Sequence, residues 1–408
     1  MNELSIKISP TAFKHLNGAH FPLLIINDEL ELNSAAYLLH RYNNGTALKT
    51  VEREAKALRK FYLFCISNNI DFIGRFSKLE RLTIGEIEHL HGVLSLREDT
   101  GELVSQTYFL HNWSTILRYI EFLYSFYQSR INDPHRLSTS RIVLEGMRNS
   151  FGINAKTPHN GIQNERIGLT PELQVKFLAI IDPTNENTLN PYKSEKVRWR
   201  NFCFFMTLMM GGNRKGESLG LKVRHFNLSG SSKSSKYFEI IKEDRTFDDY
   251  GRKEIPQVKT KGRKVELTPQ LAEIFEYYIT KIRPLFKGAK KSEYMFISIR
   301  DGKPLSALTP NMSLNDLIVQ YPEFKGKLSP HILRNTFHDI LENVLDVEFE
   351  GVAPIRKQQN KATIQEYAGG WTAGSKMVSH YPKGSIQRKV ADLQIRLQEA
   401  LLSNNGEI

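Results

Sequence analysis

The chain has 408 residues, too many for one comfortable hydrophobic core, so two domains are expected. Its formal net charge of +12 favours a polyanionic partner, because Lys and Arg displace the counterions condensed on nucleic acid. Cys65 and Cys203 lie in apolar stretches, and no CxxC pair exists, which argues against a disulfide framework and a structural zinc site. We expect a cytoplasmic protein without membrane contact, since signal-peptide and membrane-spanning patterns are absent from the sequence.

Helical patterns dominate the first part of the chain. Residues 1–44 form an N-terminal extension that contains an apolar run and a short helix at 33–42. The apolar residues of 50–67 recur at helical spacing, which predicts a longer helix there. Another helix begins after Ser105, and its aromatic stripe is more simply core packing than a platform for stacking bases. Residues 45–150 are therefore predicted to form a helical domain.

A linker and a second domain follow. Residues 151–168 are rich in Gly, Asn, Pro and Thr, as is typical of an interdomain linker. Thr170 and Pro171 then have the residue types of a helix N-cap and of the first helical position. The final helix is predicted at 385–402, where apolar residues again repeat at helical spacing.

The predicted β content is small. Short strands are expected at 237–241, 258–260 and 264–267. The sequence therefore predicts a mainly α protein with a small antiparallel β-sheet, in the α+β class. The last two strands are joined by a turn, and the basic side chains near it are candidates for contacting nucleic acid: Lys259, Lys261, Arg263 and Lys264. The alternative is an ordinary solvated hairpin tip.

Two further segments carry basic side chains at helix starts. An apolar helix ends at Gly211-Gly212, and Arg214 follows where the next helix begins. His331 and Arg334 are three residues apart, hence on one helix face, behind a Ser-Pro start. A helix N-terminus favours an anion, so this pair suits a phosphodiester. His331 and His338 as metal ligands are the alternative, but no carboxylate pair lies near them in sequence.

The order Arg…Lys…His-x-x-Arg…Gly-Trp…Tyr along the second domain resembles the tyrosine recombinases, the phage-integrase family. Residues 212–221 are similar to its first arginine box and 329–337 to its second. The resemblance implies a two-domain C-shaped clamp on double-stranded DNA. In this clamp a core-binding domain at 45–150 joins a catalytic domain at 169–384, and a helix at 385–408 could dock on a neighbouring protomer of a dimer or tetramer.

Carried over residue by residue, the resemblance implies that Arg214 and Arg334 hold the scissile phosphate. Tyr381 attacks phosphorus and leaves a 3′-phosphotyrosine, while His331 takes up or holds the proton of the nucleophile. Lys259 protonates the departing 5′ oxygen. Because the phosphodiester energy is kept in the protein–DNA bond, the resemblance implies no ATP, metal or other cofactor.

The chain also departs from the family's usual pattern. Trp371 stands where most members have His, and its indole N–H donates a hydrogen bond but cannot shuttle a proton. It lies ten residues before Tyr381, one more than is usual. Lys261 is the alternative to Lys259 as general acid, although Lys259 fits the family's spacing better. The stretch after the second arginine box is longer than usual, which predicts an inserted loop at 346–359.

Three other functions share part of this pattern. A catalytically silent DNA-binding relative would lack competent residues at one of the six catalytic positions, and none is missing here. A type IB topoisomerase uses a similar residue set to relax supercoils. A metal-dependent nuclease would lose its activity in EDTA. The helical first domain and the C-terminal helix favour recombination over relaxation.

Overall fold

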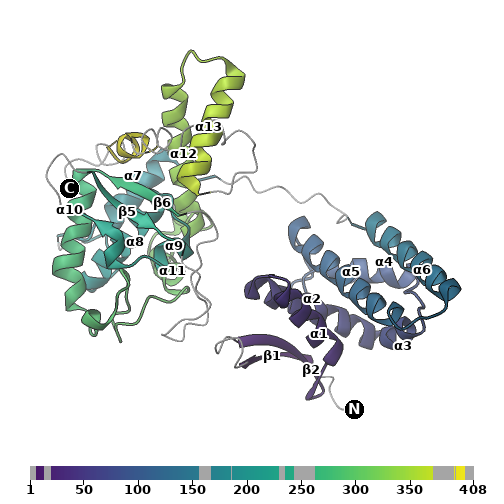
Figure 1. Ribbon diagram of the computed structural model, residues 1–408. Coiled ribbons are helices and arrows are strands. Elements are labelled where there is room, and N and C mark those ends of the chain that lie inside the picture. The colour runs from purple at the N-terminus through teal and green to yellow at the C-terminus, as the bar shows by residue number, and fades with distance from the viewer. Residues whose placement is uncertain are drawn as a thin grey trace. The chain divides into compact units, whose positions relative to one another are not determined.

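The computed structural model describes residues 6–12, 20–155, 167–184, 186–228, 235–242, 262–370, 390 and 392–399. The chain divides into two compact units, Met1–Asn164 and Glu165–Ile408, and each has its own buried core. Figure 1 shows both units. No helix among these residues is long and apolar enough to cross a membrane.

The first unit combines helices with a small antiparallel sheet in the order β1–β2–β3. Its elements are β1 Ile6–Ala12, β2 His20–Ile26, β3 Glu29–Leu30, α1 Leu32–Asn43, α2 Leu48–Ser67, α3 Phe72–Ser77, α4 Ile84–Ser95, α5 Gln106–Gln128 and α6 Pro134–Ile153. The sheet packs against α2, so the N-terminal residues contribute to the same core as the helices. Helix α6 extends three residues into the stretch expected to be a linker.

Three predicted helices of this unit are confirmed: α1 over Leu32–Asn43, α2 over Leu48–Ser67 and α5 from Gln106. The Ser105 side chain accepts a hydrogen bond from the Tyr108 N–H and so caps α5. Trp113 on α5 is buried, and its indole N–H donates to the Phe151 carbonyl at 2.8 Å. The aromatic stripe is therefore core packing, as the sequence suggested.

The second unit is mainly helical around a sheet in the order β4–β5–β6. Its elements are α7 Pro171–Ile181, α8 Glu195–Met209, α9 Lys215–Leu219, β4 Phe226–Asn227, β5 Lys236–Ile240, β6 Arg263–Leu267, α10 Pro269–Tyr277, the π-helix η3 Tyr278–Ile282, α11 Thr309–Gln320, α12 Pro330–Glu348 and α13 Pro354–Gly369. Strands β5 and β6 pair antiparallel and confirm two predicted strands, while 258–260 lies outside the described residues. The α+β class is thus confirmed.

Helix α12 is positioned by its cap and by its packing on α8. The Ser329 side chain accepts from the Ile332 N–H at 3.2 Å, and Pro330 is the first helical residue, as predicted. Phe337 and Leu341 on α12 are fully buried in the core that includes α8. This packing holds the first turns of α12, with Arg334, at the edge of the core.

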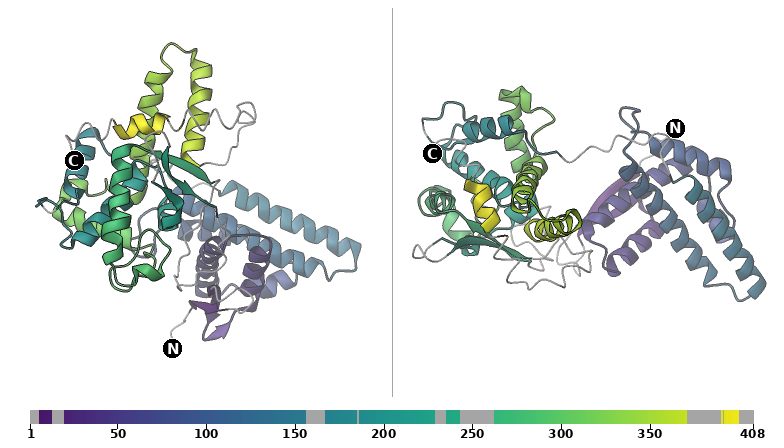
Figure 2. Two further views of the ribbon diagram at one scale, coloured as in Figure 1. Left: turned by 60° about the vertical axis from the view of Figure 1, so that its left-hand side comes forward. Right: turned by 90° about the horizontal axis from the view of Figure 1, so that it is seen from above.

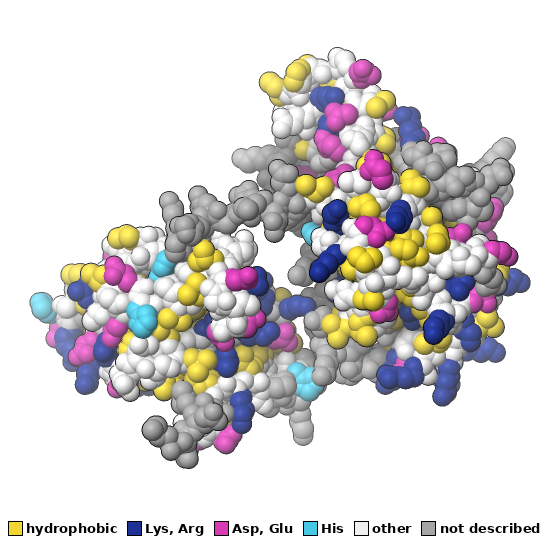
Figure 3. Space-filling view, turned by 180° about the vertical axis from the view of Figure 1, so that it is seen from behind, with side chains coloured by type: hydrophobic (Ala, Val, Ile, Leu, Met, Phe, Trp, Pro, Cys, Tyr) yellow, Lys and Arg dark blue, Asp and Glu magenta, His cyan; other side chains and the backbone are white. Residues whose placement is uncertain are grey.

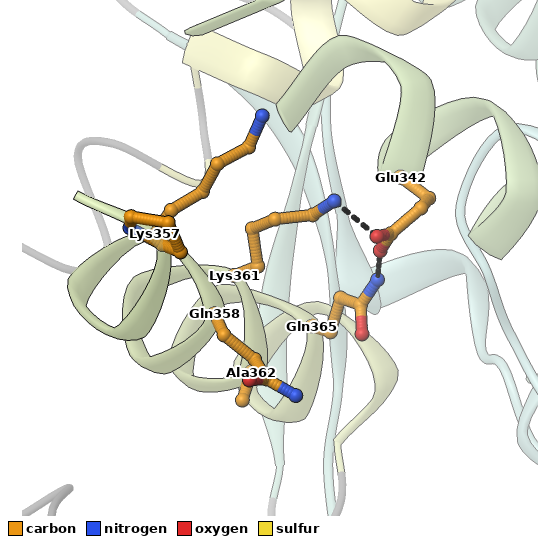
Figure 4. A pocket seen from close by; sticks show the side chains of 7 residues that line it. Glu342, Lys357, Gln358, Lys361, Ala362 and Gln365 are labelled. Atoms are coloured by element: carbon orange, nitrogen blue, oxygen red, sulfur yellow. Dashed lines mark hydrogen bonds and ion pairs between the residues drawn. The ribbon is translucent and has the colours of Figure 1, made fainter. Parts of the chain in front are cut away.

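The predicted loop at 346–359 is wrong, because most of it is helical. Helix α12 continues to Glu348 and α13 begins at Pro354, and the two helices form a hairpin that projects from the second unit (Figures 1 and 2). Lys361 pairs with Glu342 and with Asp346, the latter at 3.0 Å. The Lys361–Glu342 pair lines a pocket between the helices (Figure 4), and both ion pairs join α13 to α12.

The predicted C-terminal helix is described at residues 390 and 392–399, which are helical. Gln394 accepts a hydrogen bond from the Glu266 N–H at 3.1 Å, and Gln398 accepts one from the Thr268 N–H at 2.9 Å. Gln398 also donates to the Glu266 carbonyl at 3.0 Å. Both glutamines are almost fully buried, so the helix covers the β6 edge of its own chain.

Candidate active site

Arg214 lies at the N-cap of the short helix α9, as the sequence predicted. The preceding chain turns at Gly212, whose φ of +62° is in the left-handed region that glycine favours. The Arg214 backbone N–H donates to Glu217 at 2.8 Å, and its Nη1 donates to the other carboxylate oxygen at 2.9 Å. The guanidinium is therefore held by a residue one turn further along the same helix.

Glu217 is the centre of a larger cluster of arginines. Its carboxylate is buried and also accepts from Arg263 Nη2 at 3.1 Å, while Arg334 Nη1 lies 3.8 Å away. Three guanidiniums from α9, β6 and α12 thus surround one carboxylate. Burial raises the pKa of Glu217, but Arg263 and the Arg214 N–H lower it by more, so the carboxyl is ionised at neutral pH.

Arg214 and Arg334 share a second partner, the backbone carbonyl of Gly369. Arg334 Nη2 donates to this oxygen at 2.8 Å, and Arg214 Nη1 donates to it at 3.2 Å. Arg334 Nη1 also donates to the Gly212 carbonyl. The structure therefore brings together the two arginines that the sequence assigned to one phosphate, although they lie on different helices. Gly369 directly precedes the Gly370-Trp371 pair.

The cluster carries more positive than negative charge. Burial, and next the charge of Arg214, lower the pKa of Arg334 to about 9. Burial also lowers the pKa of Arg263, whose side chain is 1% exposed, despite its contact with Glu217. Since one carboxylate faces three guanidiniums, an additional anion would be favourable here. Arg214, with 28% of its side chain exposed, is the arginine most accessible to one.

His331 and His338 lie on α12 on either side of Arg334. His331 is exposed in the first turn, whereas His338 is only partly exposed. Burial, and next the charge of Arg334, lower the pKa of His338 to about 3, so its ring is neutral at physiological pH. In the described part of the chain, no three His, Cys, Asp or Glu side chains are grouped to hold a metal ion.

The candidate nucleic-acid contacts near the β6 turn differ in position. Arg263 is buried against Glu217 and the Gly212 carbonyl, so in this arrangement it cannot reach a phosphate. Lys264 is 37% exposed, lies over the Tyr237 ring and pairs across the sheet with Glu239 at 3.7 Å. The expected role of Arg263 as a surface contact is therefore replaced by an interior one.

The remaining predicted site residues lie outside the described residues. These are Lys259, Lys261, Trp371 and Tyr381. Lys259 and Lys261 precede the described Gly262, and Trp371 follows Gly370, which ends α13 with a left-handed φ of +61°. Gly262 and Gly370 adjoin the arginine cluster, through Arg263 and through the Gly369 carbonyl.

Replacing Gly212 with alanine is expected to destabilise the second unit. A Cβ at this position would lie 2.5 Å from two carbons of the buried Phe337 ring, and φ is positive. Gly326 is a matched control, because its φ is +74° but nothing lies within 4 Å of the place that a Cβ would take. We expect Gly212→Ala to lower the free energy of unfolding about 1–3 kcal/mol more than Gly326→Ala in urea titrations. Equal losses would contradict the role of the close approach.

No model of a known protein family matches the sequence, and the comparison with curated proteins found no match. Solved structures similar to it include the XerH site-specific recombinase bound to its difH substrate in a pre-cleavage complex. That structure has a TM-score of 0.47 and 17% sequence identity, covering 91% of this chain and 88% of the other. A post-cleavage complex of XerH with a palindromic difH substrate gives a TM-score of 0.46 and 18% identity, with 88% and 89% coverage. The integrase from a mycobacterium phage, Brujita, gives 0.32 and 12%, with 92% and 97% coverage.

Sequence reasoning missed the two residues that organise the arginines. The sequence pattern marks Glu217 only by its position after Arg214, and it predicts Arg263 at the surface of the turn. The burial of Arg263 could have been found from strand periodicity, because Val265 and Leu267 are buried on the same face. The Glu217–Arg263 pair joins α9 to β6, and no local spacing in the sequence predicts such a contact.

Proposed function

We propose that the chain is a tyrosine-type site-specific recombinase that cuts and rejoins double-stranded DNA through Tyr381. The observation that carries the proposal is the convergence of Arg214 and Arg334 on the Gly369 carbonyl. This carbonyl lies at the start of the segment that contains Trp371 and Tyr381. The arginine pair and the candidate nucleophile are thus linked by a short stretch of chain.

In this proposal, the two guanidiniums bind the scissile phosphate and stabilise the charge that develops on its oxygens. Glu217 sets their orientation, because it contacts Arg214 through both the backbone and the side chain. The Gly369 carbonyl occupies guanidinium donors that a phosphate oxygen would take over, so it is the first contact that DNA would displace. Tyr381 attacks phosphorus, the P–O5′ bond breaks, and the 5′ oxygen receives a proton from Lys259.

The charge distribution supports DNA as the partner. The chain carries a net charge of +12, and Figure 3 shows Lys and Arg side chains over one face of the second unit, most densely at its lower edge. Exposed basic residues also occupy two touching loops of this unit: Lys287, Lys290, Lys291, Arg300 and Lys303. Such groups neutralise DNA phosphates without reading sequence.

Tyr381→Phe is expected to abolish covalent attachment while leaving DNA binding nearly unchanged, because only the nucleophilic oxygen is lost. The measurement uses duplexes tiled from the DNA that flanks the gene for this chain. Adducts are detected on denaturing gels and binding is detected by gel shift. Tyr367, a partly buried residue of α13, provides the matched control as Tyr367→Phe, for which adducts should persist. Adducts formed by Tyr381→Phe would overturn the assignment.

The other candidate functions give different results in the same assays. A plasmid that carries two target sites exchanges segments with a recombinase, whereas a topoisomerase only relaxes it. A catalytically silent relative shifts DNA but forms no adduct. Cleavage that stops in EDTA would indicate a metal-dependent nuclease, since the proposed chemistry uses only side chains.

We also propose that the C-terminal helix links protomers on DNA, in a dimer or tetramer. The helix lies on the β6 edge of its own chain through Gln394 and Gln398. The β6 edge of a second copy would offer it identical partners. Cross-linking of the chain with and without DNA would detect such an exchange.

A further inference from the structure

A second cluster of arginines lies in the first unit, around the carboxylate of Glu54. Helices α1, α2 and α5 pack against one another there (Figure 1). Glu54 on α2 is completely buried. Arg41 on α1 donates from Nε to both of its oxygens, at 3.2 and 3.1 Å, and from Nη2 at 3.0 Å. Arg118 on α5 donates to it from Nη2 at 3.3 Å.

The cluster has more positive charge than the burial of Glu54 requires. Arg41 alone contacts both carboxylate oxygens and so neutralises the buried charge. Arg118 adds a second guanidinium, which gives these three residues a net charge of +1. A cluster that served only to stabilise Glu54 would need no second arginine, because each charge removed from water carries a desolvation cost.

Both guanidiniums are fixed, yet both still reach solvent. The side chains of Arg41 and Arg118 are 28% and 37% exposed. Arg118 is held from two sides, since its Nη2 also donates to Thr115 Oγ1 at 3.1 Å. Its Nε has no hydrogen-bond partner among the described residues but is buried, so a further contact falls to the exposed part of the guanidinium. The arginines therefore retain donor capacity that Glu54 does not use.

The surroundings of the cluster are also basic. Arg53 and Lys56, next to Glu54 on α2, are exposed. His111 on α5 lies close to Arg53, and burial followed by the charge of Arg53 lowers the pKa of its ring. Glu52 is also exposed beside them, so the exposed residues that flank Glu54 on α2 add a net charge of +1 to that of the cluster, which favours an anion.

We infer that Arg41 and Arg118 form a phosphate clamp for the DNA backbone, with Glu54 as the positioning residue that fixes both guanidiniums. A guanidinium can donate two parallel hydrogen bonds to the oxygens of one phosphate. Because Glu54 orders them in advance, binding costs less side-chain entropy than it would for free surface arginines. The choice of DNA as the source of the phosphate rests on the proposed function.

The first test compares Arg118→Gln with Arg75→Gln in the full chain. Arg75 is a matched control, since it is 32% exposed and pairs one to one with Glu86 at 2.8 Å in the same unit. Affinity for a short mixed-sequence DNA duplex is measured over a range of salt concentrations. Arg118→Gln should weaken binding roughly tenfold and reduce the slope of log K against log salt by about 0.9. Arg75→Gln should change neither.

The second test uses Glu54→Gln, which adds one positive charge to the chain. If charge alone mattered, this variant would bind DNA more tightly. Loss of positioning predicts weaker binding with a reduced salt slope, and thermal unfolding shows whether the variant is folded. If either glutamine variant is unfolded, Arg118→Lys provides the readout. This variant keeps the positive charge but loses the two parallel N–H donors of the guanidinium. We therefore expect weaker DNA binding with an unchanged slope of log K against log salt.

The outcomes separate this inference from the proposed function. If the unmodified chain binds DNA but Arg118→Gln and Arg118→Lys behave like Arg75→Gln, the clamp is wrong and the recombinase proposal stands. Tighter binding by a folded Glu54→Gln variant would overturn the positioning role. If the unmodified chain does not bind DNA at any salt concentration, both proposals fail.

Discussion

Arg334→Ala is expected to reduce the rate of strand cleavage about a hundredfold to a thousandfold. Losses of this size follow when one hydrogen-bond donor to the charge that develops in a transition state is removed. Arg334 donates to the Gly212 and Gly369 carbonyls and lies beside Arg214, so its loss leaves one guanidinium of the pair. DNA binding should change far less, because the many phosphate contacts of the remaining surface supply most of the affinity. The measurement is the rate of covalent adduct formation at saturating DNA.

Arg283→Ala controls for the loss of a buried arginine as such. Arg283 is 8% exposed and donates to the carbonyls of Ser292 and Tyr294, at 2.7 and 2.6 Å, away from the cluster. Its replacement should lower stability but leave the cleavage rate of the folded protein unchanged. Arg334→Lys should give an intermediate rate, since it keeps a charge but not the two-pronged geometry. Cleavage by Arg334→Ala at the unmodified rate would exclude this arginine from the site.

The elements that the sequence predicted well are those with local signals. Thr170, Ser105 and Ser329 all cap the helices that they were predicted to start. The caps work through a side chain and a backbone N–H only a few residues away, so the relevant contacts are visible in a short stretch of sequence. The position of Arg214 at a helix start follows in the same way from the double glycine.

The N-terminal sheet shows where periodicity fails. Strand β2 is recognisable in the sequence only as an apolar run, because Phe21, Leu23 and Leu24 are all buried and no alternation marks a strand. Without a two-residue period, an apolar run fits a buried strand or a buried helix segment equally well. Its partner β1 is specified by cross-strand pairing, which a single sequence does not display.

The prediction for the insertion after the second arginine box failed for a different reason. The loop was predicted only from the extra length of this stretch, but Pro354 is the first residue of α13, where proline is tolerated. Lys357 and Lys361 both pair with Asp346 across the hairpin, at 2.8 and 3.0 Å. Each of these ion pairs joins one residue of α12 to one residue of α13. The sequence of either helix alone therefore contains only one partner of each pair.

The site itself could be predicted as a set of residue types but not as a charge network. The sequence indicated Arg214 and Arg334 as a pair, and the shared Gly369 carbonyl brings them together. That Glu217 is the anion around which they assemble depends on strand β6 placing Arg263 in the interior. The network is therefore a property of the tertiary fold, and its stability can be tested separately from its chemistry.

Glu217→Gln is expected to destabilise the second unit by about 3–5 kcal/mol at neutral pH, because it leaves buried guanidiniums without their counter-charge. The carboxylate is fully buried and lies within 3.1 Å of Arg263 and 2.9 Å of Arg214. Glu239→Gln is the control, since Glu239 is 38% exposed and pairs with Lys264 only at 3.7 Å. That exposed pair should contribute less than about 1 kcal/mol. Urea unfolding of both variants gives the two free energies.

The same variant also has a defined pH dependence. Because the folded pKa of Glu217 lies below its ordinary value of about 4.3, its ion pairs contribute fully at higher pH and are lost as the pH falls through the lowered pKa. The stability difference between the unmodified chain and Glu217→Gln should therefore be largest near neutrality and shrink in acid. A difference that stayed constant down to acidic pH would contradict this prediction, because Glu217→Gln keeps the shape of the side chain and removes only its charge. It would mean that ionisation of Glu217 is not what stabilises the arginine cluster in the unmodified chain.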